Sequence, residues 1–320
     1  MSEAPLLDES HTIPVVADPL AEALHFLRMD GMFYCLSEMT SPWGLDLPTM
    51  PDSLWFHVVT AGACTLIDAA GDEHHIQTGD VVVLPHGGGH RALDVPGTDT
   101  PLVFDLPHDY VSRQYAVLRH GGGGAPTTII CGVLQLGHPA ARTLISLLPE
   151  LIRIDGRTAA AEWPWLSTLL GLMASETRAA KPGGEAVVTR LCDILVIQAI
   201  RHWIETAPEA REGWLGALRD PAIGRAIGLI HRFPEREWSV ATLAAEVAMS
   251  RSAFSARFTE LVGTSAMQYA TEWRMNVAVD LLRDDGLPIA VVAERLGYGS
   301  EAAFSRAFKR VTGKPPSTLR

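Results

Sequence analysis

The sequence contains few cysteines and no long apolar run. Its four cysteines are widely spaced among 320 residues and include no Cys-x-x-Cys pair. No segment approaches the roughly 20 apolar residues that span a bilayer. Residues 1–14 lack the basic stretch and apolar core of a secretory leader. We therefore expect a cytoplasmic protein with no membrane role, whose thiols are free and mostly buried.

The net charge of −11 is unevenly distributed along the chain. Residues 221–320 contain 13 basic and 10 acidic residues, a net charge of +3, whereas residues 1–220 contain 13 basic and 27 acidic residues, a net charge of −14. The asymmetry between the two parts is more informative than the total. The excess of acidic residues therefore lies outside residues 221–320.

Three regions differ in the spacing of their apolar residues. Up to about residue 126, short apolar runs alternate with turn residues, which predicts an antiparallel sandwich or barrel. In the middle, apolar residues recur three and four positions apart, as in amphipathic helices. The predicted strands are Leu54–Thr60, Cys64–Asp68 and Asp80–Pro85, and the predicted helices are Asp18–Met29, Ala140–Ile152, Trp163–Ala180 and Glu185–Glu205.

The last region is helical in pattern and contains a helix-turn-helix unit. Ser239 is suited to cap a helix over Val240–Val247, Met249-Ser250 makes a turn, and a second helix covers Arg251–Leu261. Phe254 and Phe258 lie four residues apart on the second helix, which predicts one apolar face. A short helix, a tight turn and a second helix form the geometry that seats one helix in a major groove.

The same arrangement returns about fifty residues later. Pro288 opens a helix that continues through Arg295, Gly297-Tyr298-Gly299 makes the turn, and Ser300 caps a helix over Glu301–Val311. One long helix over Ser265–Arg283 separates the units and is expected to fix their relative placement. Two units on one rod can enter successive major-groove segments about 34 Å apart.

Residues 222–320 resemble the DNA-binding domain of AraC/XylS-type transcription regulators. The resemblance implies a bacterial regulator that binds double-stranded DNA through both units. It rests on Ile289–Ala293, Gly297-Tyr298, Ala303–Lys309 and Gly313–Pro316, and on Trp273-Arg274-Met275, Ala278 and Leu281-Leu282 in the long helix.

This resemblance places DNA-facing residues on the second helix of each unit. We expect Arg306 to be the main reader, because a guanidinium pairs bidentately with guanine or holds a phosphate. The first unit has Ser and Ala at its reading positions, so shape and phosphate contacts are expected to contribute more there. For each basic residue taken alone, the alternative to a DNA contact is a position on a solvated helix face. The expected DNA-facing residues are Ser252, Ser255, Ala256, Glu301, Ala302, Ser305 and Arg306, and the expected phosphate contacts are Arg251, Arg257, Lys309 and Arg310.

A second resemblance covers the N-terminal region and the middle of the chain. The G-x5-P-x-G-x2-H signature of cupins is matched by Gly79, Pro85, Gly87 and His90. Further segments resemble the cupin-type ligand domain of a subgroup of these regulators: Pro42-Trp43-Gly44, His57–Cys64, Cys131–Val133 and Leu147–Glu150.

Together the resemblances imply an α+β fold in three parts. We expect an antiparallel cupin-like barrel that acts as a sensor over residues 1–125, and a helical linker and dimerisation region over residues 126–215. The double helix-turn-helix domain is expected over residues 216–320.

The candidate effector pocket contains His57, Cys64, His86 and His90. Enzymatic cupins resemble one another in a His-x-His pair with a downstream Glu, but here Val59 replaces the second His and the Glu is missing. His57 and His90 could hold a divalent metal, since imidazole suits zinc, iron or nickel, yet catalytic sites usually need three protein ligands. Structural or polar pocket histidines are the favoured alternative, and no cofactor is required. Oxidation of Cys64 or Cys131 is a further hypothesis.

We therefore expect a DNA-binding transcription regulator, not an enzyme, whose cupin-like domain senses a small molecule, a metal or an oxidant. Its expected partners are DNA, the effector, a second copy of the chain and, for activation, RNA polymerase. One alternative is a cupin enzyme, such as a metal-dependent dioxygenase or isomerase, with a DNA-binding appendage. Another is an N-terminal region that serves only dimerisation. Bound metal with turnover would favour the first, and the lack of any thermal shift with candidate effectors would favour the second.

Overall fold

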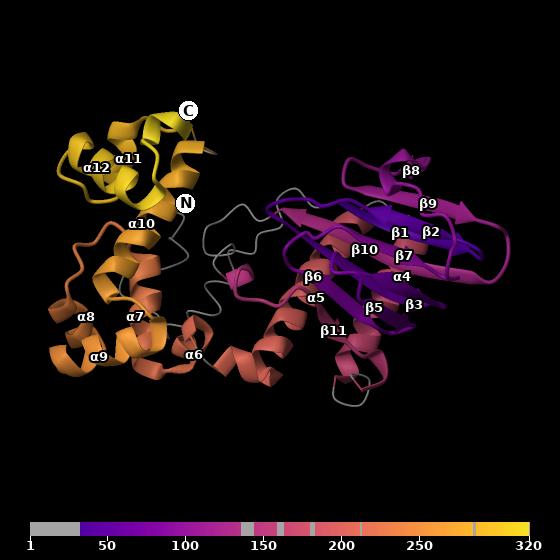
Figure 1. Ribbon diagram of the computed structural model, residues 1–320, viewed down its shortest axis with the longest axis horizontal. Coiled ribbons are helices and arrows are strands. Elements are labelled where there is room, and N and C mark those ends of the chain that lie inside the picture. Colours follow the sequence, from indigo (N-terminus) through magenta and orange to yellow (C-terminus); the bar gives the residue numbers. More distant parts are fainter. Residues whose placement is uncertain are drawn as a thin grey trace, which may run out of the picture. The chain divides into compact units, whose positions relative to one another are not determined.

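The computed structural model describes residues 33–135, 144–158, 163–179, 183–211, 213–283 and 286–319. The chain divides into two compact units, with residues 23–211 in one and residues 212–320 in the other. The first contains two sheets and two long helices, and the second is helical (Figure 1). The predicted α+β fold is thereby confirmed. The predicted helix over Asp18–Met29 lies outside the described residues.

The N-terminal unit contains a seven-stranded and a four-stranded sheet. Their strand orders are β11-β6-β3-β10-β1-β9-β8 and β2-β7-β4-β5. Neighbouring strands run antiparallel except β1 and β9, which are parallel. The strands are β1 (Phe33–Thr40), β2 (Gly44–Leu47), β3 (Ser53–Ala61), β4 (Ala63–Ile67), β5 (Glu73–Gln77), β6 (Val81–Leu84), β7 (His90–Leu93), β8 (His108–Tyr110), β9 (Tyr115–Gly121), β10 (Pro126–Gln135) and β11 (Ile152–Ile154).

Residues from both sheets form one apolar core. Trp55 and Val59 from β3 share this core with Cys64 and Leu66 from β4. Trp55 and Val59 are four positions apart and Cys64 and Leu66 are two apart, and such even spacings place side chains on one face of a strand. The three predicted strands correspond to β3, β4 and β6 and are confirmed.

The segment after residue 125 is a strand and does not begin the helical region. β10 lies between β3 and β1 near the centre of the larger sheet, and six consecutive residues of it, 129–134, are buried. A strand buried on both faces has a continuous apolar run without alternation, so its period does not distinguish it from a buried helix. The expected boundary at residue 125 therefore separates β10 from the strands with which it pairs.

The prediction of a helix over Ala140–Ile152 was also wrong at its C-terminal end. Only residues 144 and 145 are helical in the described part of that segment, and Ile152 begins β11. Pro149 explains the difference, because proline removes a backbone donor and interrupts a helix.

The two other predicted middle helices are confirmed as α4 (Pro164–Ala179) and α5 (Gly184–Thr206). They pack against each other, and α5 also contacts β6 and β11. Among the described residues, no helix is both long and apolar enough to cross a bilayer.

The C-terminal unit confirms the helices of both predicted helix-turn-helix units. The first unit consists of α8 and α9, the second of α11 and α12, and α10 separates them. The helices of this unit are α6 (Gly213–Arg219), α7 (Pro221–Arg232), α8 (Val240–Glu246), α9 (Arg251–Val262), α10 (Ala266–Arg283), α11 (Ile289–Arg295) and α12 (Glu301–Thr312). A 3-10 turn over Pro316–Leu319 follows α12, and two further 3-10 turns, Val103–Asp105 and Pro208–Arg211, lie in the N-terminal unit.

The turn of the second helix-turn-helix unit lies against the loop that leads into the first unit. Gly297 has φ +74°, and a Cβ at this position would lie 2.2 Å from the backbone oxygen of Glu235, in the loop before α8. Arg274 of α10 donates to the backbone oxygen of Arg236 (3.0 Å), and its guanidinium lies 5.7 Å from the centre of the Tyr298 ring. The placement of the second unit therefore depends on this loop contact as well as on the predicted rod.

Candidate nucleic-acid interface and buried thiol–histidine site

The second helices of the two units, α9 and α12, are built in the same way. Ser250 accepts a hydrogen bond from the amide of Ala253 (3.3 Å), and Ser300 accepts one from Ala303 (3.2 Å). These bonds satisfy amides that have no partner inside the helix. The rings of Phe254 and Phe258 are 5.6 Å apart, as are those of Phe304 and Phe308, and all four are buried. One face of each helix is thereby fixed in the core.

The opposite faces carry the residues that we expect to contact DNA. Ser305 is half-buried. All the others are exposed: Arg251, Ser252, Ser255, Ala256 and Arg257 on α9, and Glu301, Ala302, Arg306, Lys309 and Arg310 on α12. Their exposure leaves these side chains accessible, and their contact with DNA stays a prediction.

The basic residues differ in their partners within the unit. Arg257 forms ion pairs with Asp220 and Glu260, both at 3.1 Å. Asp220 also caps α7, where its carboxylate accepts hydrogen bonds from the amides of Ala222 and Ile223. Although partial burial opposes it, these amides and the Arg257 guanidinium hold the pKa of Asp220 below its ordinary value. Arg257 is therefore already engaged by two carboxylates.

On α12 the corresponding surface is less constrained. Arg306, Lys309 and Arg310 form no ion pair with any residue that the structure describes. Three cations within two turns of one exposed helix face give a local positive surface. Such a surface suits the phosphates of a nucleic acid.

In the N-terminal unit, His57 on β3 and His90 on β7 meet across the two sheets. Their Nε2 atoms are 2.7 Å apart, and His90 Nδ1 lies 3.0 Å from the backbone oxygen of Gly88. If His90 Nδ1–H donates to Gly88, His90 Nε2 is the acceptor and His57 Nε2–H the donor. Burial, and secondarily the neighbouring His57, lower the pKa of His90 to about 3, which keeps it neutral.

The structure extends this site to residues that the pocket prediction did not include. Cys131 faces His57 in the β10–β3 register, and Cys35 faces Cys131 in the β1–β10 register. Ser37 Oγ lies 3.5 Å from Cys131 Sγ and donates to Cys35 Sγ at 3.8 Å. The sequence singled out Cys131 as a candidate for oxidation but carried no signal that joins it to Cys35 and His57, because that depends on the pairing of β1, β10 and β3.

The other two candidate pocket residues lie elsewhere in the unit. Cys64 is buried opposite Ile76 between β4 and β5, and His86 Nε2 lies 3.0 Å from the backbone oxygen of Leu148. Among the described residues, no group of three His, Cys, Asp or Glu side chains is arranged to hold a metal ion. The donor set of this part of the chain therefore does not fit a three-ligand metal centre, and His57 and His90 form a hydrogen-bonded pair.

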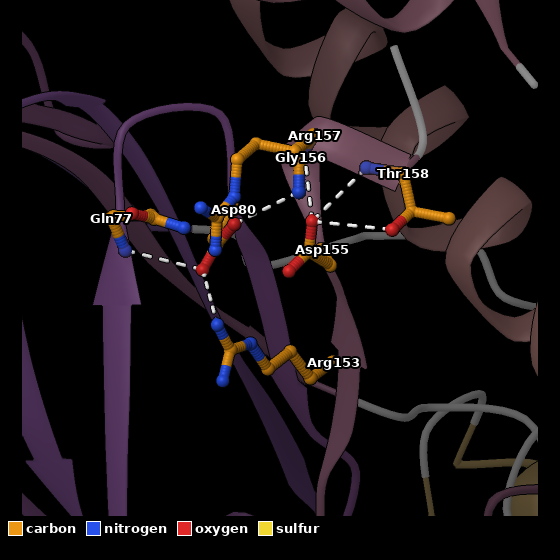
Figure 2. A network of polar contacts seen from close by, with 7 residues as sticks. All are labelled: Gln77, Asp80, Arg153, Asp155, Gly156, Arg157 and Thr158. Atoms are coloured by element: carbon orange, nitrogen blue, oxygen red, sulfur yellow. Dashed lines mark hydrogen bonds and ion pairs between the residues drawn. The ribbon is translucent and has the colours of Figure 1, made fainter. Parts of the chain in front are cut away.

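A second polar cluster joins the cupin signature to the segment after β11 (Figure 2). The fully buried carboxylate of Asp80 accepts hydrogen bonds from Arg153 and from the Gly156 amide, both at 2.8 Å. Gly156 approaches Gly79 so closely that a Cβ on it would lie 2.4 Å from the Gly79 oxygen. Gly79 and Asp80 thus form a docking point for this segment as well as a turn.

Comparison with known proteins agrees with both parts of the molecule. The cupin family profile matches residues 18–205, and a helix-turn-helix domain profile matches residues 243–320. A Streptomyces lividans protein named as an AraC-like transcription regulator is 31% identical over 308 residues, covering 95% of this chain and 98% of that protein. The chain belongs to the AraC family of transcription regulators.

Two further proteins resemble this AraC-family chain over different lengths. The RCS-specific transcriptional activator RclR of Escherichia coli (strain K12) is 29% identical over 265 residues, 83% of each protein. The DNA-binding domain of AdpA, solved in complex with a target DNA, is 29% identical over 30% of this chain and 86% of that domain, with a TM-score of 0.29.

Proposed function

We propose that this AraC-family regulator binds specific double-stranded DNA through α9 and α12, and that its cupin domain binds an effector that alters this binding. The observation that carries the proposal is the repeated recognition helix, held by the same cap and the same buried phenylalanine pair in both units. Each helix exposes the side chains expected to face DNA. The proposal places the protein in the cytoplasm, and any activation would add a contact with RNA polymerase.

We further propose that α4 and α5 form the surface on which a second copy docks. Trp165 and Leu172 on α4 are exposed and lie seven residues apart, as do Val187 and Ile194 on α5. A spacing of seven places both members of each pair on one helix face, in the pattern that self-associating helices use. A dimer would present two DNA-binding units to two half-sites. Leu172→Glu with Ile194→Glu should convert the dimer into a monomer in sedimentation experiments.

The cupin domain is proposed to bind its effector without turnover. Val59 occupies the position of the second metal-binding histidine, and the described residues include no three-ligand group. The relatives that span the chain are transcription regulators by name, which supports the same proposal.

Binding of the full-length protein to DNA from its own upstream region tests the proposal. Footprinting across a salt series should show protection of neighbouring major-groove segments, with affinity that falls as salt rises. If neither the reduced protein nor the protein supplied with cell extract gives sequence-selective, salt-sensitive protection, the DNA-binding proposal is wrong.

A further inference from the structure

The strongest unassigned chemistry in the described chain is the row of side chains across β1, β10 and β3. Cys35, Cys131 and His57 are consecutive register partners on these strands. Antiparallel partners point to the same face of a sheet, so the three side chains share the interior face. All three are buried, with Cys131 8% exposed. Two thiols and an imidazole from distant parts of the sequence are thus brought together inside the cupin domain.

The hydrogen bonds around the row give its members different roles. His90 Nδ1 is bound to the Gly88 oxygen, so the chain of bonds assigns the hydrogen of His57 to Nε2 and leaves His57 Nδ1 as the basic nitrogen. A base held by a third group beside a thiol is the arrangement that activates cysteine nucleophiles. His90 therefore orients His57, and the β10–β3 register places Cys131 beside this imidazole, while the Cys131 thiol donates to the backbone oxygen of Cys35 at 3.6 Å. The oriented imidazole is the candidate base for Cys131.

Cys131 and Cys35 also differ as thiols. A hydrogen bond with Cys35 lowers the pKa of Cys131; burial opposes this effect, and a hydrogen bond with His57 strengthens it. The bond with Cys131, together with burial, raises the pKa of Cys35. Cys131 is the register partner of His57 and Cys35 lies one strand further from the imidazole, so Cys131 is assigned as the nucleophile and Cys35 as the second thiol.

We propose that Cys131 is an oxidation site that His57 and His90 activate, and that Cys35 is its resolving thiol. The oxidant is a small two-electron oxidant, either a hydroperoxide or a hypohalous acid. A thiol with so little exposed surface excludes bulky electrophiles, and an adjacent second thiol favours a disulfide over a lasting adduct.

The chemistry proceeds in two balanced steps. The Cys131 thiolate attacks the electrophilic oxygen of a hydroperoxide, the O–O bond breaks, and Cys131 sulfenic acid and hydroxide or alkoxide form. A hypohalous acid gives the same sulfenic acid with release of halide. The Cys35 sulfur then attacks the Cys131 sulfur, an S–S bond forms, and the sulfenic oxygen leaves as water with the Cys35 proton.

The backbone allows this disulfide without a change of register. Partners in antiparallel strands have Cα atoms about 4.5–5.5 Å apart, within the range of natural disulfides. The bond would link β1 to β10 and remove the Cys131 contact with His57. Oxidation would thereby change the surroundings of His57, which contacts His90 on the smaller sheet.

Peptide mapping of the full-length protein tests the site. Reduced protein is treated with hydrogen peroxide in one arm and hypochlorous acid in another, and remaining thiols are alkylated in denaturant. A Cys35–Cys131 cross-linked peptide is expected in at least one arm, while Cys64 and Cys192 stay alkylated. Cys64→Ser is the matched control, since Cys64 lies in the same core with a pKa raised to about 12 by burial and the nearby Asp94 and Asp80.

The variants separate the three roles. In the Cys35→Ser variant the reaction should stop after the first step, leaving a sulfenic acid on Cys131 that dimedone traps. Cys131→Ser should abolish the reaction. His57→Asn should slow the oxidation of Cys131 by roughly tenfold or more. The site is refuted if Cys131 reacts no faster than Cys64 or if neither oxidant forms the cross-link. Mapping the parent protein decides this even if a variant fails to fold.

The regulatory part of this inference rests on the proposed function. Operator affinity is measured on the same reduced and oxidised samples, and oxidation is expected to change it in the parent but not in Cys131→Ser. A cross-link with unchanged affinity would contradict the switch while leaving the regulator proposal intact. Absence of operator binding by the reduced protein would contradict the proposed function and leave the thiol chemistry separately measurable.

Discussion

The two helix-turn-helix units share a scaffold and differ in the surface that they expose. Both recognition helices begin at a serine cap, bury two phenylalanines four residues apart, and end at a left-handed glycine, Gly263 or Gly313. Their exposed faces are unlike. On α9 the face is mostly Ser and Ala, and Arg257 is paired with two carboxylates, whereas α12 exposes three basic side chains.

This difference separates the requirements of folding from those of recognition. Caps and buried rings are set by the geometry of the motif, so both units keep them. The exposed positions are free to vary, and here the free positive charge is concentrated on the second unit. We expect α12 to supply most of the electrostatic attraction to DNA, and α9 to depend more on shape and on Arg251.

Replacing the turn glycine of the second unit, Gly297, should have the largest effect on stability. Gly297→Ala places a Cβ against the Glu235 backbone and forces alanine into positive φ, so we expect a loss of about 2–4 kcal/mol of stability. Gly313→Ala is the matched control, because Gly313 also has positive φ but nothing within 4 Å of the added Cβ. It should cost about 1 kcal/mol. Equal shifts in thermal unfolding would show that the contact between this turn and the loop before α8 is unimportant.

Arg306→Ala should weaken specific DNA binding more than Arg257→Ala. Arg306 forms no ion pair with the described residues, and a bidentate base contact contributes about 1–3 kcal/mol of discrimination. Arg257 is already engaged within the domain. Binding isotherms on operator and scrambled DNA check this, and a larger loss of specificity for Arg257→Ala would reverse the assigned roles.

Asp220→Ala should destabilise the first unit by about 1–2 kcal/mol, because it removes the α7 cap and the partner of Arg257. The pKa of Asp220 is lowered in the folded state, so its charge stabilises the fold above the ordinary value of 3.8, and this contribution is lost as the pH falls through the lowered value. Asp220→Asn keeps a cap without the charge. The parent should therefore lose more stability than Asp220→Asn as the pH falls below the ordinary value of 3.8, and parallel acid unfolding curves would contradict this.

The smallest effect is expected where the units are most alike. Ser250→Ala and Ser300→Ala each remove one helix cap of nearly the same geometry. Each should cost about 1 kcal/mol, and the two costs should agree. Thermal unfolding of the two variants checks the agreement, and a clear difference would show that the shared scaffold conceals unequal packing.

Local signals in the sequence predicted much of this molecule. The caps at Ser250 and Ser300 and the phenylalanine spacing predicted both helix-turn-helix units, because those features depend on residues close together in the chain. The cupin signature led to His90 and the resembling segment His57–Cys64 led to His57, and the structure brings the Nε2 atoms of the two histidines within 2.7 Å. Buried strand β10 and short strand β11 were mistaken for parts of a helical region, since a continuous apolar run has no period of its own.

What the sequence could not predict depends on pairing between distant segments. The alignment of Cys35, Cys131 and His57 requires the register of three strands. The pairing of Arg257 with Asp220 requires the packing of α9 beside the start of α7. Neither is encoded in a spacing along the chain, so only the folded structure identifies these partners.

The salt dependence of operator binding tests the central claim most directly. We would compare the parent with an α12 variant in which Arg306, Lys309 and Arg310 are alanine, and with an α9 variant in which Arg251 and Arg257 are alanine. Each lost phosphate contact lowers the slope of log affinity against log salt by about 0.9. The account predicts a fall of about 2 or more for the α12 variant and about 1 or less for the α9 variant. A larger fall for the α9 variant, or no change in either, would contradict it.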